Sequence, residues 1–228
     1  MALTQEDLQK IKQEKLAALR RAFKSIDKQL NQTNSVYMLQ DNPLKDIEVI
    51  STGSLMVDAA TGIGGIPLGK VVSIGGLESS GKSLLALRTI AQAQKKGYVC
   101  AFLDLEQSFS PSWAALQGVN VNELVLSQPT IMEDTFNIII GLIKTGALSL
   151  VVVDSISSLV PRAELEDDIE KQHMALVARG LSKFLKIVVP LCAEYNCTLF
   201  TISQLRNTMN LYGPSYQIMG GKIIEFAM

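Results

Sequence analysis

The chain has 228 residues, of which 47% are hydrophobic and 19% charged, and its formal net charge is −1. This composition excludes a disordered chain and suits one substantial domain with a small appendage. It also excludes a protein that attracts nucleic acid through an overall basic field, so any DNA site must be a local strip of Lys and Arg.

A helix is predicted at the N-terminus. Thr4 can cap it, with Asp7 three positions later as a short capping-box partner. Its apolar residues recur at spacings of three and four and form one stripe, made of Leu16, Leu19, Phe23, Ile26 and Leu30. The stripe needs burial, either on the chain's own domain or on a neighbouring subunit. We assign residues 1–34 to this helix and 35–48 to a linker with a short extended stretch at Val36–Leu39.

From residue 49 onward, apolar runs alternate with helical stretches. The runs predict strands at Val71–Ile74, Val99–Leu103, Leu124–Leu126, Leu150–Val153 and Leu199–Ile202. Helices are predicted at 82–96, 111–117, 132–145 and 174–195. Runs that are apolar on both faces favour a mainly parallel sheet covered by helices on both sides, which is an α/β fold. A last strand-like run, Ile223–Phe226, directly precedes the end at Met228, so we expect the domain of residues 49–228 to be cut short.

A phosphate-binding motif, G-x-x-x-x-G-K-[ST], lies between a predicted strand and a predicted helix. Its glycines would let backbone N–H groups face a phosphate at the positive end of the helix. Lys82 would reach the β- and γ-phosphates, and the Ser83 hydroxyl would ligate Mg²⁺. The sequence therefore predicts a site for ATP and Mg²⁺. With the residue that follows, the motif comprises Gly76, Leu77, Glu78, Ser79, Ser80, Gly81, Lys82, Ser83 and Leu84.

Polar residues follow three other predicted strands. Asp154 ends an apolar run and fits a Walker B carboxylate, which holds Mg²⁺. Glu106 could activate the water that attacks the γ-phosphate, or it could be a solvated loop acid. Gln204 could sense the γ-phosphate, or it could be a turn residue. Trp113, the only tryptophan, could stack on an adenine, although core packing is the commoner role.

Several classes of site are not expected. The three cysteines, Cys100, Cys192 and Cys197, lack C-x-x-C spacing, and the chain has one histidine, so no zinc site is predicted. Reduced cysteines fit a cytoplasmic location. No apolar signal core opens the sequence, and no run approaches the ~18 apolar residues of a membrane span, so we expect no membrane partner.

The phosphate-binding motif, Ile50–Leu55, Val152–Ser155 and the pair Gly220–Gly221 resemble the RecA family of DNA recombinases in order and spacing. The similarity extends from the N-terminal helix to Met228. The resemblance implies a RecA-like P-loop ATPase core, ATP and Mg²⁺ as cofactors, and single-stranded and double-stranded DNA as partners. It also implies filaments in which the N-terminal helix and residues 35–40 dock on the neighbouring protomer.

The resemblance assigns roles to individual residues. It implies that Glu106 is the catalytic glutamate, that Gln204 senses the γ-phosphate, and that both act with Lys82. It places Trp113 against the adenine. Residues 162–172 match the first DNA-binding loop and 205–219 the second. The positions that match DNA contacts are Met174, Arg179, Ser182, Lys186, Arg206, Gly220 and Gly221.

One group of these positions can also be read without the family. Arg179, Ser182 and Lys186 are spaced by three and four residues, so they could share one helix face and meet phosphates together. They could equally form an ordinary solvated helix face.

The sequence departs from the family at four places. Ser110 stands where an aspartate often faces the adenine, so base specificity is expected to be looser. The first loop is more acidic and lacks the usual glycines. Glu225 replaces a lysine of the subunit interface. The chain ends before the lysines that complete a neighbour's ATP site, so we expect weak ATPase activity from this chain alone.

These observations favour an ATP-dependent recombinase that forms filaments on single-stranded DNA and exchanges strands with a homologous duplex. The alternative is a nucleotide-gated, DNA-binding or accessory filament protein with little ATPase activity. A P-loop kinase or an unrelated motor ATPase shares the motif, but the sequence offers no acceptor site or lid.

Overall fold

The structure is a computed structural model that describes residues 4–31, 33, 35–38, 40–41, 47–166, 174–207 and 216–218. The chain separates into two units, Met1–Asp46 and Ile47–Met228. The domain limits predicted at residues 34 and 48 remain predictions.

In the first unit, helix α1 spans Gln5–Leu30 and begins with the predicted capping box between Thr4 and Asp7. It ends at Asn31 in a left-handed conformation. The exposed fractions of Leu19 and Leu30 are 48% and 56%, and α1 contains no buried residue. The other stripe residues, Leu16, Phe23 and Ile26, are half-buried, so within this unit the apolar stripe is present and only partly covered. Residues 35–38 form bends and irregular backbone, and Leu39 lies outside the described residues, so the short extended stretch stays a prediction.

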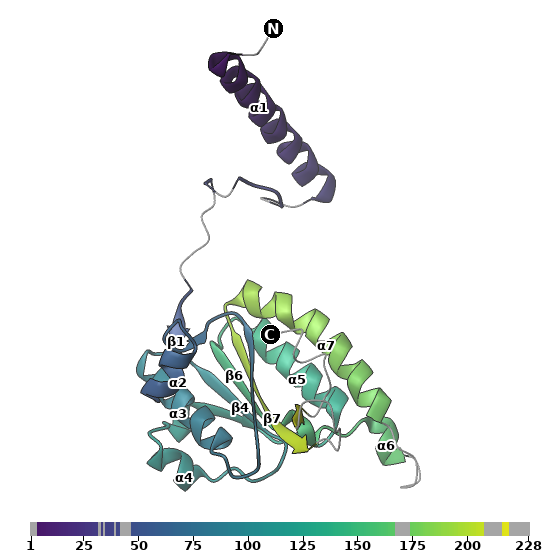
Figure 1. Ribbon diagram of the computed structural model, residues 1–228. Coiled ribbons are helices and arrows are strands. Elements are labelled where there is room, and N and C mark those ends of the chain that lie inside the picture. The colour runs from purple at the N-terminus through teal and green to yellow at the C-terminus, as the bar shows by residue number, and fades with distance from the viewer. Residues whose placement is uncertain are drawn as a thin grey trace. The chain divides into compact units, whose positions relative to one another are not determined.

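The second unit is built on a parallel sheet (Figure 1). Its order is β3-β7-β6-β4-β5, and β8 pairs antiparallel with β7. The α/β class with a mainly parallel sheet is thereby confirmed. The strands are β3 (Val71–Gly76), β4 (Cys100–Asp104), β5 (Leu124–Ser127), β6 (Leu150–Asp154), β7 (Thr198–Asn207) and β8 (Tyr216–Ile218).

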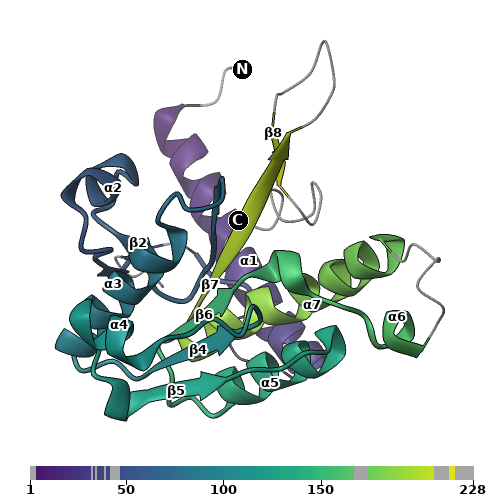
Figure 2. The ribbon, with the colours of Figure 1, turned by 90° about the horizontal axis from the view of Figure 1, so that it is seen from below.

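Helices cover both faces of this sheet, as Figures 1 and 2 show. Alternate residues of β6 face opposite layers: Val151 and Val153 pack in the cluster with α5 and α7, and Leu150 and Val152 in the cluster with α3. Burial of each such side chain stabilises the fold by about 1.5–3 kcal/mol. The helices are α3 (Lys82–Lys95), α4 (Pro111–Leu116), α5 (Met132–Lys144) and α7 (Met174–Tyr195).

Smaller elements complete the unit. Asp58 in α2 accepts hydrogen bonds from the Thr52 backbone N–H and from the Ser51 and Thr52 hydroxyls, which fixes the turn before this helix. Gly65 must be glycine, because a Cβ there would collide with the backbone carbonyl of Ile50. No helix in the described ranges combines the length and apolarity of a membrane span. The smaller elements are β1 (Val49–Ile50), α2 (Leu55–Ala60), β2 (Ile66–Pro67), η1 (Val121–Glu123), η2 (Ile156–Ser158) and α6 (Arg162–Glu166).

Candidate functional site

The carboxyl ends of β3, β4 and β6 meet at one edge of the sheet, beside Gln204, which lies within β7 and is therefore not a turn residue. The strand register places Gly76 opposite Gln204, and Asp104 opposite Asp154. In open α/β sheets this edge is where ligands bind. The residues that the sequence analysis picked from four separate strand ends are thus brought to a common edge.

The P-loop runs from Gly76 at the end of β3 to Lys82 at the start of α3. Gly81, with φ of 87°, is the N-cap, and no side chain caps the helix. A Cβ on Gly81 would meet nothing within 4 Å, whereas a Cβ on Gly76 would lie 2.7 Å from the Ser80 hydroxyl. Lys82 donates a hydrogen bond of 2.6 Å from Nζ to the Leu77 carbonyl. An uncapped helix start with a lysine folded over its loop fits an anion such as a phosphate.

Ser83 and Asp154 form the next part of the site. The Ser83 hydroxyl donates a 2.5 Å hydrogen bond to Oδ2 of Asp154, which is 7% exposed. Burial raises the pKa of Asp154. The Ser83 hydrogen bond and the charge of Lys82 lower it, while the charges of Glu106 and Asp104 raise it further.

A divalent cation suits this pair. It would relieve the crowding of negative charge around Asp154. Within the described part of the chain, no three His, Cys, Asp or Glu side chains gather as a metal-binding cluster. Mg²⁺ would therefore be held by Ser83, Asp154, nucleotide oxygens and water, which suits its preference for few protein ligands.

Glu106 lies where three polar side chains converge on one of its oxygens. Its Oε1 accepts hydrogen bonds from the Ser155 hydroxyl at 2.6 Å, from Gln204 Nε2 at 3.4 Å and from the Ser158 hydroxyl at 3.5 Å. The backbone N–H of Gln204 donates to the Ser157 hydroxyl at 2.9 Å. Glu106 and Gln204, 98 residues apart in sequence, are therefore in direct contact.

No role was predicted for the serines of η2 and its flank, although Ser155 ends the stretch Val152–Ser155 named above. Ser155, Ser157 and Ser158 look like ordinary polar residues of a turn after a strand, and no spacing rule distinguishes them. Only the fold shows that they reach Glu106 and Gln204.

Trp113 lies on α4, whose first turn is capped by Ser110. The Ser110 hydroxyl accepts a 3.4 Å hydrogen bond from the Trp113 backbone N–H. The indole residue is 49% exposed, which does not fit the core-packing alternative. Trp113 is thus available to a flat ligand such as an adenine, and that role stays a prediction.

The predicted DNA contacts are placed only in part. On α7, Arg179 and Lys186 are exposed and Ser182 is partly buried. Met174 begins α7 and Arg206 lies in β7, but the structure does not describe their side chains. Gly220 and Gly221 lie outside the described residues.

Of the two predicted DNA-binding loops, the structure describes residues 162–166 of the first and residues 205–207 and 216–218 of the second. The first loop starts with α6, where Arg162 donates its backbone N–H to Glu133 and forms a 2.7 Å ion pair with Asp134. The second loop begins and ends as the antiparallel pair of β7 with β8.

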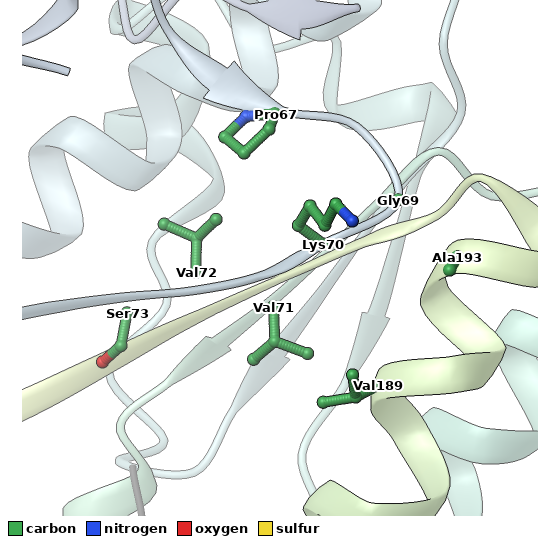
Figure 3. Close-up of a pocket in the computed structure, with 8 residues that line it drawn as sticks. All are labelled: Pro67, Gly69, Lys70, Val71, Val72, Ser73, Val189 and Ala193. Atoms are coloured by element: carbon green, nitrogen blue, oxygen red, sulfur yellow. The ribbon is translucent and has the colours of Figure 1, made fainter. Parts of the chain in front are cut away.

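A separate cavity of about 350 Å³ lies at the other end of β3 (Figure 3). Val71, the first residue of β3, and Lys70 just before it line one side, and Val189 and Ala193 line it from α7. None of its lining residues belongs to the sheet edge that carries the P-loop, which we call the P-loop edge, so the cavity is not part of the candidate site.

A family model described as the RecA N-terminal domain matches residues 17–228. The RecA protein of Chloroherpeton thalassium is 40% identical over 226 residues, which is 99% of this chain and 63% of that protein. The RecA protein of a Wolbachia strain from Drosophila simulans is 41% identical over 214 residues, which is 93% of this chain and 60% of that protein. The RecA protein of Colwellia psychrerythraea is 41% identical over 217 residues, which is 95% of this chain and 63% of that protein. The chain thus spans about three fifths of the length of these curated relatives.

Proposed function

Because the chain belongs to the RecA family, we propose that it is an ATP-dependent DNA recombinase. It binds single-stranded DNA as a nucleoprotein filament and promotes homologous pairing and strand exchange. The observation that carries the proposal is the meeting of Lys82, Ser83, Asp154, Glu106 and Gln204 at one sheet edge.

The P-loop edge holds the nucleotide in this proposal. Backbone N–H groups at the start of α3 face the phosphates, and Lys82 leaves the Leu77 carbonyl to pair with them. Ser83 and Asp154 hold Mg²⁺, which neutralises phosphate charge when bound. Trp113 provides a flat surface for the base, with Ser110 beside it.

Glu106 is the group that accepts a proton from the attacking water. The Ser155 hydroxyl holds its carboxylate by a 2.6 Å hydrogen bond, so the group is oriented before nucleotide arrives. Gln204 lies against Glu106 and precedes the second predicted DNA loop. An amide that can bond either Glu106 or a phosphate would link nucleotide state to that loop.

DNA is gripped through its backbone, while sequence is read by base pairing. Arg179 and Lys186 provide exposed positive charge on α7. Self-association uses α1, whose apolar stripe needs a covering surface such as a groove on a second protomer. A cytoplasmic location belongs to the same proposal.

A second candidate is a nucleotide-gated accessory filament protein with little catalysis. The ion pair of Arg162 with Asp134 favours it, because the positive charge at the base of the first loop is already neutralised. Glu106→Gln distinguishes the two functions. An accessory protein has negligible ATP hydrolysis before the substitution, whereas a recombinase loses measurable hydrolysis because of it.

The experiment for the first candidate measures ATP hydrolysis with and without single-stranded DNA, and binding of a labelled oligothymidine by anisotropy. We expect DNA to stimulate hydrolysis, and binding to require ATP and weaken with salt. Equal oligothymidine affinity with and without nucleotide contradicts the proposal. Strand exchange with a homologous duplex then tests the complete reaction.

A further inference from the structure

We propose that Asp104 and Gln128 are positioning residues that hold the loop of residues 105–109, and with it Glu106, at the edge of the sheet. The inference rests on the proposed function, because it concerns the group that would accept the proton. Neither residue had a role in the sequence analysis.

Asp104 is a carboxylate in an unusual place. It is 1% exposed, at the end of the interior strand β4. Its Oδ1 accepts the backbone N–H of Ser108 at 3.1 Å, and its Oδ2 accepts the backbone N–H of Phe109 at 2.9 Å. Among the described residues no Lys or Arg forms an ion pair with it. Because a buried polar group must be hydrogen-bonded to be tolerated, these donors are required.

The third donor comes from a neighbouring strand. Gln128 follows β5, which pairs with β4, and its Nε2 donates to Oδ2 of Asp104 at 2.8 Å. Gln128 is itself exposed at the surface. Its amide thus connects the carboxylate to the end of β5, and replacing it removes one hydrogen bond without opening the core.

The loop that these bonds close contains Glu106. Before Glu106, the Leu105 backbone N–H donates to the Asp154 carbonyl at 2.8 Å. After it, Gln107 has φ of 52°, and the Ser108 and Phe109 amides return to Asp104. A non-glycine residue keeps a left-handed backbone only where its surroundings enforce it. Glu106 is therefore held from both sides, and the second side depends on Asp104.

A residue that positions Glu106 should affect the rate of hydrolysis, whereas a residue that only stabilises the fold should not affect it selectively. Among the described residues, Gln128 is hydrogen-bonded to Asp104 and neither to the P-loop nor to Ser83, and it carries no charge, so nucleotide binding should not depend on Gln128. The orientation of Glu106 should depend on Gln128 through Asp104, and orientation affects kcat rather than KM.

The test compares Gln128→Ala with Gln128→Lys, which restores a donor of similar reach, and with Asn137→Ala as a matched loss of an exposed amide. For Gln128→Ala we expect kcat for ATP to fall about tenfold, as misplacement of a catalytic group does, with KM within about threefold. The lysine variant should recover most of kcat, and Asn137→Ala should match the wild type. If kcat per nucleotide-binding site is unchanged in Gln128→Ala, the proposal is overturned. It is also overturned if kcat falls equally in Gln128→Ala and Gln128→Lys.

Amide hydrogen exchange provides a readout that needs no catalysis. The Ser108 and Phe109 amides should exchange about tenfold faster in Gln128→Ala, while those of α5 keep the wild-type rate. If the wild-type chain binds nucleotide but never hydrolyses it, the proposed enzymatic function fails, and this exchange alone decides whether the two residues hold the loop. If the Ser108 and Phe109 amides exchange at the wild-type rate in Gln128→Ala, the proposal that Asp104 and Gln128 hold the loop is overturned.

Discussion

The Ser83 hydroxyl and the Asp154 carboxylate meet in a 2.5 Å hydrogen bond, although 71 residues separate them in the sequence. Ser83 belongs to the first turn of α3, which follows β3, and Asp154 is the last residue of β6. The contact exists because the sheet brings the carboxyl ends of β3 and β6 to the same edge. Both oxygens already occupy neighbouring positions, as two ligands of a single cation must. The central part of the account, a site for Mg²⁺ and ATP, depends on this relationship.

The first prediction concerns Asp154→Asn. Burial raises the pKa of Asp154, so the folded chain is less stable with this carboxylate charged. Without Mg²⁺, the asparagine variant should therefore melt at a higher temperature than the wild type. With Mg²⁺, it should bind ATP at least tenfold more weakly, a loss of about 1.4 kcal/mol. Asp41→Asn, which removes an exposed carboxylate, is the control, and a variant with wild-type Mg²⁺ dependence contradicts the assignment.

Glu106→Gln tests the proton acceptor. The amide keeps the shape of the side chain but cannot take a proton, so hydrolysis should fall by about 10²–10⁴. Affinity for ATP should stay within a few-fold of the wild type, because Glu106 contacts serines and Gln204 rather than the P-loop. Measured by phosphate release, Glu123→Gln should behave as the wild type. A Glu106→Gln chain that hydrolyses ATP at the normal rate excludes this role.

Asp58 should make stability depend on pH. Partial burial raises its pKa, but the hydrogen bonds from Ser51 and Thr52 outweigh that effect, so the pKa is lowered from 3.8 overall. A lowered carboxylate pKa stabilises the fold above the unfolded value, and this stabilisation disappears as pH falls through the folded value. Asp58→Ala should thus cost about 1–2 kcal/mol at pH 7, from charged hydrogen bonds at a partly exposed site. In urea unfolding, the difference in free energy of unfolding between the wild type and Asp58→Ala should become smaller below about pH 4. A difference that does not change with pH contradicts this prediction.

Arg179 and Lys186 are expected to contact DNA phosphates. Replacing both by alanine should reduce the slope of log affinity for oligothymidine against log salt concentration by about 1.4, or about 0.7 for each lost contact on a single strand. The double variant Lys95→Ala/Lys144→Ala makes the same change of net charge at other exposed positions and should leave the slope unchanged. If both pairs lower the slope equally, the effect is one of overall charge, and α7 makes no specific contact.

Local sequence was sufficient to predict the strands and helices that surround the site. The P-loop pattern placed a helix at 82–96, and α3 spans Lys82–Lys95. The run of apolar residues at Leu150–Val153 became β6, with Asp154 as its last residue. These elements are fixed by periodicity and by glycine chemistry, both of which can be read within a few residues.

Long-range order could not be predicted in the same way. No pattern in the sequence states that β7 lies between β3 and β6, and this order alone brings Gln204 onto Glu106. The short elements α2 and β1 were also missed. The equally short α4 was predicted, and it has a capping Ser110 and a proline in its first turn, whereas no side chain caps α2. The part played by Asp104 depends on hydrogen bonds to backbone groups, which any residue type offers.

The most direct test of the account is a calorimetric titration of the purified chain with ATP in the presence of Mg²⁺, for the wild type and for Lys82→Ala. Trp113, as the only tryptophan, gives an independent fluorescence signal in a parallel titration. We predict saturable binding at one site, weakened at least tenfold, or by about 1.4 kcal/mol, in Lys82→Ala. No saturable binding at millimolar ATP, or equal binding by both chains, would contradict the account.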